Sequence, residues 1–153
     1  MKALLVVDLQ KGFHPPQNLV KKIERVLPKY DTIIFTQFIK KKNSLFQKRL
    51  KMKKEYQAKS PESQFAIDPP TSAVIIKKTG YGFTHENLNV LKKLGIKKID
   101  ICGVDTDMCV LAVCFDLWDE EIIPRVLPKL CSSDGKLHDK AMDIIRNSFK
   151  NPL

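Results

Sequence analysis

Short apolar runs alternate with segments of helical periodicity along most of the chain. Residues 3–8 (ALLVVD) are apolar until a closing carboxylate, which is typical of a central parallel strand. Residues 18–28 place Leu19, Ile23 and Leu27 on one helical face. The same patterns predict further strands at 32–37, 73–77, 97–102 and 121–127, and further helices at 43–57, 85–94, 107–119 and 136–148.

This alternation predicts an α/β protein with a doubly wound (Rossmann-like) fold. We expect a mostly parallel sheet of five to six strands with helices on both faces. The length fits a single domain, residues 1–153. Pro124 suggests an irregular or edge position for the last strand. In such a sheet, sites lie at the carboxyl ends of the strands, beside the point where the strand order reverses.

The charge is concentrated in one segment. The formal net charge is +10, and residues 40–59 contain nine basic residues against one acidic residue, Glu55. Three interpretations stay open for this segment: a solvated surface helix, a surface that steers anionic substrates, or a binding site for nucleic acid or another phosphate surface. No nucleic-acid motif accompanies it, which argues against nucleic acid as a partner.

The composition also narrows location and cofactor. No apolar run reaches the roughly 20 residues that a membrane span needs, and the apolar start is too short for a signal peptide, so we expect a cytoplasmic protein without a membrane partner. The four cysteines form no C-x-x-C pair, and there are three histidines, which argues against structural zinc. Glycine-rich nucleotide motifs are absent, so no cofactor is predicted.

Three chemically distinct side chains follow predicted strands. Asp8 ends the first strand, Lys78 follows the third, and Cys109 opens the helix after the fourth. A lysine and a helix N-terminus stabilise a thiolate, while a carboxylate can accept the thiol proton and return it to a leaving amine. We therefore expect a nucleophilic Cys109 whose pKa is lowered, making it the most acidic of the four thiols.

Three segments match a known sequence pattern. VVDLQKGF places its aspartate at Asp8, VIIKKTGYGF has Lys78 three residues before Tyr81, and ICGVDTDMCVLAVCFDL contains Cys109. Together they resemble the isochorismatase-like cysteine hydrolases, which include the nicotinamidases. The resemblance implies Asp8, Lys78 and Cys109 as catalytic residues. It also implies a cis peptide between Val104 and Asp105, which turns the amides of Asp105 and Cys109 into an oxyanion hole.

The chain departs from that pattern at two places. Nicotinamidases carry an Asp-x-His…His metal site after the second strand, whereas TQFIKKKNSLFQKRL contains no histidine. We therefore expect a member without that metal site, and nicotinamide becomes a poor candidate substrate. Gly80 and Gly82 flank Tyr81, which suggests an altered pocket wall. We expect Phe13, Phe38 and Tyr81 to line the substrate pocket.

The sequence thus predicts a hydrolase that cleaves a small amide or related acyl substrate through a thioester on Cys109. Asp8 is the expected general acid and base, and Lys78 stabilises the thiolate. Two alternatives remain: an idle binding module whose segment 40–59 binds an anionic partner, and a redox-active thiol.

His138 is expected to fix a turn with Ser132 and Ser133. The almost wholly apolar helix 107–119 predicts a homo-oligomer, a dimer or tetramer.

Overall fold

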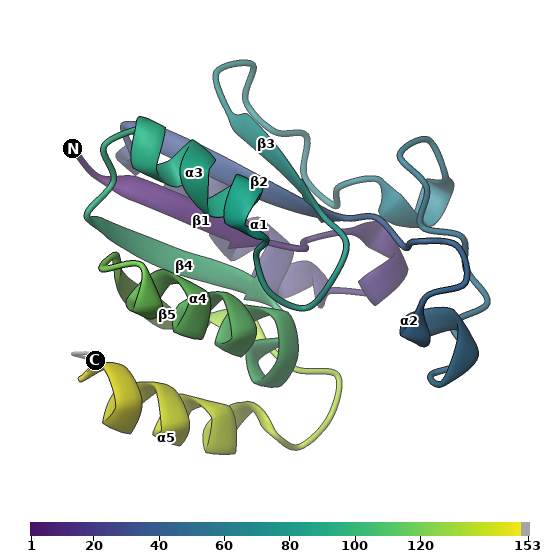
Figure 1. Cartoon of the computed structure of the whole chain (residues 1–153). Coiled ribbons are helices and arrows are strands. Elements are labelled where there is room, and N and C mark those ends of the chain that lie inside the picture. Colours follow the sequence, from purple (N-terminus) through teal and green to yellow (C-terminus); the bar gives the residue numbers. More distant parts are fainter. Residues whose placement is uncertain (151–153) are drawn as a thin grey trace.

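Five parallel strands form the centre of the molecule (Figure 1). The computed structural model describes residues 1–150, so the end of the predicted domain, 151–153, lies outside the described residues. The sheet order is β3-β2-β1-β4-β5. The predicted α/β class with a doubly wound parallel sheet is therefore confirmed. The strands are β1 (Ala3–Val7), β2 (Thr32–Phe38), β3 (Val74–Lys78), β4 (Lys98–Val104) and β5 (Ile123–Ser132).

Helices cover both faces of the sheet. In Figure 1, α1 lies behind the sheet, and α3 and α4 lie in front of it. The long helices are α1 (Gln17–Val26), α3 (His85–Lys93), α4 (Leu111–Asp119) and α5 (His138–Phe149). Short turns of helix complete the set: η1 (Lys11–Phe13), η2 (Leu27–Lys29), α2 (Leu45–Lys48), η3 (Pro61–Ser63) and the π-helical η4 (Thr106–Val110).

The strand order reverses between β1 and β4, and the chain packs most tightly there. Leu4, Leu5, Val6 and Val7 of β1 are all fully buried, as expected for a central strand covered on both faces. Gly103 pairs with Val7 at a φ of 122°, and a Cβ on Gly103 would lie 2.1 Å from the Val7 carbonyl oxygen. Only glycine permits this approach, which brings the segments that leave β1 and β4 together.

The predicted helix 43–57 is wrong. Regular helix is limited to one turn, α2, and Lys51 lies at a φ of 55°, outside the helical region. Leu45 and Leu50, whose spacing would place them on one apolar face of such a helix, are 70% and 58% exposed. The apolar residues of this segment have no sheet face to cover, because it projects beyond the carboxyl ends of the strands (Figure 1, right).

Two further boundaries differ from expectation. The predicted helix 107–119 begins as the π-helical turn η4 and becomes α-helical only at Leu111. The last strand is longer than predicted and runs to Ser132, with an irregular register opposite Ile101–Gly103. It is an edge strand, as Pro124 suggested. Within residues 1–150, no helix has the length and apolarity to cross a membrane.

The outward side of α4 is the basis for a prediction about assembly. Val113, Cys114 and Leu117 are buried against the core, while Phe115 and Trp118 are each 43% exposed. Self-association remains a prediction, and we expect light scattering at micromolar concentration to give the mass of a dimer or tetramer. Trp118→Glu should shift the mass toward the monomer, because a buried unpaired charge is strongly unfavourable. Leu45→Glu, at an exposed position on α2, is the control. A monomeric unmodified protein would contradict the prediction.

Candidate active site

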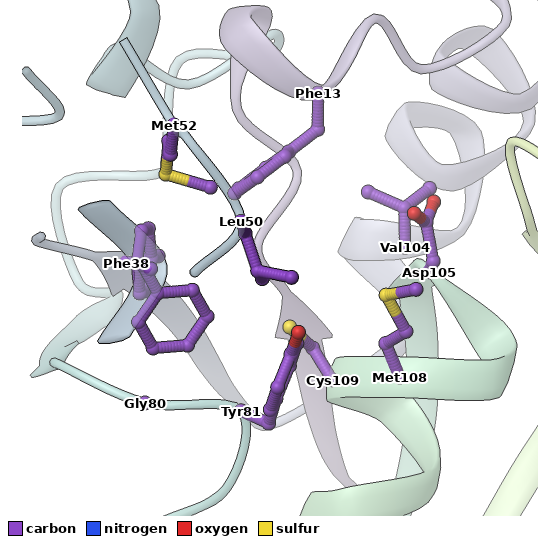
Figure 2. Close-up of a pocket in the computed structure, with 11 residues that line it drawn as sticks. Phe13, Phe38, Leu50, Met52, Gly80, Tyr81, Val104, Asp105, Met108 and Cys109 are labelled. Carbon is purple, nitrogen blue, oxygen red and sulfur yellow. The ribbon is translucent and has the colours of Figure 1, made fainter. Parts of the chain in front are cut away.

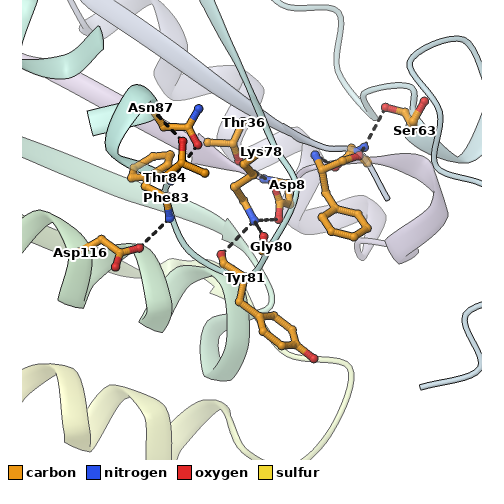
Figure 3. A network of polar contacts seen from close by, with 12 residues as sticks. Asp8, Thr36, Ser63, Lys78, Gly80, Tyr81, Phe83, Thr84, Asn87 and Asp116 are labelled. Carbon is orange, nitrogen blue, oxygen red and sulfur yellow. Dashed lines mark hydrogen bonds and ion pairs between the residues drawn. The ribbon is translucent and has the colours of Figure 1, made fainter. Parts of the chain in front are cut away.

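Asp8, Lys78 and Cys109 meet at the carboxyl edge of the sheet, beside the reversal of strand order. Asp8 follows β1, Lys78 is the last residue of β3, and Cys109 lies in η4 after β4. Lys78 Nζ is 2.7 Å from Asp8 Oδ2 (Figure 3). Cys109 lies close enough to Asp8 and Lys78 for both groups to shift the pKa of its thiol. The fold thus brings together three residues that are far apart in the sequence.

Asp8 is held rigidly by the neighbouring strand. Its backbone has a φ of 44°, a conformation that aspartate tolerates better than most residues. The Asp8 amide donates to Thr36 Oγ1 over 2.9 Å, and the Thr36 hydroxyl donates to Asp8 Oδ1 over 2.6 Å. Thr36 of β2 is fully buried. No role was predicted for Thr36 from the sequence. One carboxylate oxygen is therefore engaged by Thr36 and the other by Lys78.

Lys78 reaches Asp8 from two strands away and is itself buried. Its Nζ donates to the carbonyl oxygens of Gly80 and Tyr81 over 2.7 Å and 2.9 Å (Figure 3). Burial lowers the pKa of Lys78, but the interactions with Asp8 and Cys109 outweigh burial, so its pKa is raised overall. The side chain is therefore an ammonium at neutral pH.

The expected lowering of the Cys109 pKa in the resting protein is wrong, whereas its place as the most acidic of the four thiols stays a prediction. Burial raises its pKa well above the usual value, the charge of Asp8 raises it further, and the charge of Lys78 lowers it. Burial also raises the pKa of Cys102, Cys114 and Cys131, the last to about 12. Cys109 differs from the other three in facing a cation. The sequence identified the lysine, but it does not show how far burial and the neighbouring carboxylate oppose the effect of that lysine on the pKa of Cys109.

The turn that contains Cys109 is anchored at both ends. The peptide bond between Val104 and Asp105 is cis, at the position that the family resemblance implies. The Asp105 carbonyl accepts hydrogen bonds from the amides of Met108 and Val110. Thr106 Oγ1 lies 2.8 Å from Nδ1 of His138, on α5. The structure therefore corrects the expected partner of His138, which was placed near Ser132 because sequence proximity alone suggested it.

A largely apolar pocket of about 180 Å³ opens above Cys109 (Figure 2). Phe13, Phe38 and Tyr81, which the sequence assigned to the pocket, all line it. Its volume lies below the roughly 300–1,000 Å³ typical of sites for drug-sized ligands, so it suits a small molecule. Sequence reasoning missed Phe46, Leu50 and Met52, which also line the pocket, because their spacing resembled a helix face. Its lining residues with polar side chains are Tyr81, Asp105 and Cys109.

The residues after β2 do not fit a nicotinamidase-type zinc site. Within residues 1–150, no three His, Cys, Asp or Glu side chains cluster in a way that could hold a metal ion. The segment instead buries the ammonium of Lys40, which donates to backbone carbonyls and would repel a cation. His14 approaches this segment, but its Nε2 lies 3.0 Å from Nζ of Lys54.

The fold agrees with comparisons to known proteins. The family model for the isochorismatase domain matches residues 2–153, so the chain belongs to the isochorismatase family and is a hydrolase of that family. A search of curated proteins finds no match.

Several solved structures share this fold. An isochorismatase-like hydrolase from Alkaliphilus metalliredigens is 20% identical, with a TM-score of 0.84 over 99% of this chain and 93% of that chain. The pyrazinamidase of Pyrococcus horikoshii in complex with zinc is 24% identical, with a TM-score of 0.84 over 97% and 96%. A nicotinamidase from Bacillus subtilis is 16% identical, with a TM-score of 0.82 over 98% and 97%.

The buried ion pair generates a prediction about stability. Both side chains are fully buried, so Lys78→Met strands the Asp8 carboxylate without its counter-charge. We expect the free energy of unfolding at pH 7 to fall by about 3 kcal/mol, measured by urea denaturation. Lys77→Met, an exposed neighbour, should change it by less than about 0.5 kcal/mol. Equal effects of the two substitutions would contradict the prediction.

Asp105 generates a prediction about pH. Burial raises its pKa from 3.8 to about 6, and the charges of Asp107, Asp134 and Asp8 contribute. The folded state therefore binds a proton more tightly than the unfolded state. This contribution to stability is present below pH 3.8 and is lost as the pH rises through 6. The free energy of unfolding of Asp105→Asn, minus that of the unmodified protein, should be higher at pH 7.5 than at pH 4. Urea denaturation of both proteins at each pH measures this difference. A difference that is independent of pH would refute the assignment.

Proposed function

We propose that this isochorismatase-family hydrolase cleaves a small amide through a thioester on Cys109, with Asp8 transferring protons and Lys78 supplying fixed positive charge. The observation that supports this most directly is the buried Asp8–Lys78 pair beside a thiol at the base of an apolar pocket. The family membership supports a hydrolase, and the retained cysteine supports covalent catalysis.

The first step moves a proton within the site. The thiol proton of Cys109 passes to the Asp8 carboxylate, which leaves a thiolate, a neutral carboxylic acid and the Lys78 ammonium. The total charge of the three groups is zero before and after the transfer. The transfer also neutralises the Asp8 charge, which is one of the causes of the raised thiol pKa. A high pKa of the resting Cys109 thiol is therefore compatible with a thiolate that forms only within the triad of Asp8, Lys78 and Cys109.

The next steps conserve atoms and charge. The sulfur attacks the carbonyl carbon, and the C=O electron pair moves to oxygen, which the amides of Asp105 and Cys109 would stabilise. The tetrahedral intermediate expels the amine, which takes the proton from Asp8, and a thioester remains. Water then attacks the thioester while the Asp8 carboxylate takes a proton from it. That proton returns to the departing sulfur and restores the thiol.

The pocket indicates the chemistry of the acyl group. Its walls are aromatic and aliphatic, and Asp105 adds a carboxyl that ionises above about pH 6. A carboxylate on the substrate would be repelled by Asp105 and poorly solvated by the walls. The proposed substrate is therefore a small neutral amide with an apolar acyl group. The exposed basic residues of segment 40–59 do not line this pocket and so do not assign it an anionic substrate.

The test is ammonia release from a panel of small neutral aromatic and aliphatic primary amides. Cys109→Ala should abolish turnover, and Asp8→Asn should reduce kcat by about a hundredfold or more, because it removes the proton acceptor. Lys77→Met, at an exposed neighbouring position, is the matched control and should keep full turnover. Full turnover by Cys109→Ala would refute the mechanism. No turnover of any amide, with salt-sensitive binding of a polyanion, would favour the binding-module alternative.

A further inference from the structure

Residues 40–56, here called the cap, form the outer wall of the pocket. The cap leaves the end of β2 and extends past the carboxyl edge of the sheet, with α2 at its far end (Figure 1). Phe46, Leu50 and Met52 face the pocket, and Figure 2 shows Leu50 and Met52 opposite Cys109 and Met108. The position of this segment therefore sets the size of the space above the thiol.

One buried lysine at the start of the cap holds its returning segment, residues 52–57. Lys40 is 7% exposed, although most of its basic neighbours are solvated. Its Nζ donates to the carbonyl oxygens of Met52 and Lys54 over 2.9 Å and 2.5 Å. Its amide donates to the Tyr56 carbonyl, and its own carbonyl accepts from Gln57 Nε2. Four hydrogen bonds thus join this single residue to positions 52–57.

Aromatic packing fixes the base of the cap and also Phe46. Tyr56 is buried and stacks on Phe13 with ring centroids 5.0 Å apart, and it meets the Phe38 ring edge-on at 5.6 Å. Gly12 leaves no room beneath this ring, since a Cβ there would lie 2.5 Å from the Tyr56 hydroxyl oxygen.

Phe46 contacts the Phe38 and Tyr81 rings, and its carbonyl accepts a hydrogen bond from the Met52 amide. The Lys40 ammonium adds a second tie to the backbone of Met52, four residues before the Tyr56 anchor, and also ties the carbonyl of Lys54.

We propose that Lys40 is the positioning residue of the pocket: its buried ammonium holds Met52 against the opening and so limits the acyl groups that reach Cys109. This inference builds on the proposed function, because it defines the substrate size that the same site accepts. Lys40 touches neither the substrate nor the triad and acts through Met52 and the neighbouring Leu50. The buried ammonium also explains why a basic, irregular segment forms a wall of an apolar pocket.

Replacing Lys40 removes a specific restraint. Lys40→Met keeps an apolar side chain of similar length in the buried position but leaves the Met52 and Lys54 carbonyls without their donor. Because unsatisfied carbonyls favour exposure to water, residues 50–54 should move outward. The Tyr56 anchor and the triad remain. The opening of the pocket should widen while the chemistry at Cys109 is preserved.

Alkylation by reagents of different size tests this directly. In Lys40→Met, labelling of Cys109 by pyrenyl maleimide should accelerate about tenfold or more, because both charged hydrogen bonds from Lys40 to the backbone of the cap are lost. Labelling by the small iodoacetamide should stay within about twofold, because access rather than reactivity changes. Lys41→Met, an exposed neighbour with the same change of charge, is the matched control. The proposal would be overturned if Lys40→Met accelerated labelling by both reagents equally, or if Lys41→Met accelerated it as much as Lys40→Met.

Steady-state kinetics separate positioning from general damage. For the best small amide, Lys40→Met should raise KM with kcat within about twofold, and kcat/KM should shift toward amides with larger acyl groups. Lys40→Arg, which keeps the charge and the donors, should restore most of the selectivity. Loss of kcat alone, with selectivity unchanged, would refute the positioning role. If the unmodified protein hydrolyses no amide, the proposed function fails, but the alkylation ratios still decide the role of Lys40.

Discussion

The ion pair between Asp8 and Lys78 is the interaction on which the site depends. Both side chains are fully buried, and they connect β1 to β3 across β2, where Thr36 also binds Asp8. A buried charge is tolerated only where it is paired and hydrogen-bonded, and here the Gly80 and Tyr81 carbonyls complete the shell of the ammonium. The ends of three strands and the loop after β3 are thereby held in one arrangement around the thiol.

The connection between β2 and β3 forms the outer wall of the pocket instead of covering the sheet. A doubly wound sheet normally places a helix in such a crossover, and that helix would cover a face of the sheet. Here the crossover forms the cap at the carboxyl edge instead, and Lys40 and Tyr56 fix it there. The apolar residues of the cap therefore cover the ligand space rather than the core. This arrangement explains both the short α2 and the exposed Leu45.

Rules for parallel sheets were sufficient to predict the fold and the location of the site. Asp8, Lys78 and Cys109 each follow a recognisable apolar strand, so the strand-end rule placed them at one edge before any contact was known. The cap could not be predicted in this way, because Leu45, Phe46 and Leu50 have helical spacing but no sheet face to cover. The Thr36–Asp8 and Thr106–His138 contacts join residues about thirty positions apart, and no local pattern indicates them.

The raised pKa of Cys109 changes how the proposed chemistry must work. An enzyme that stored a free thiolate would need cationic groups to outweigh burial, and a single lysine already paired with a carboxylate does not. The Asp8–Lys78 pair instead allows a proton to move from sulfur to oxygen without any change in the charge of the buried site. Desolvation then opposes this transfer much less than it opposes loss of the proton to water. A dry pocket and the proposed nucleophilic cysteine are compatible for this reason, because the carboxylate that disfavours the resting thiolate is also the proposed acceptor of its proton.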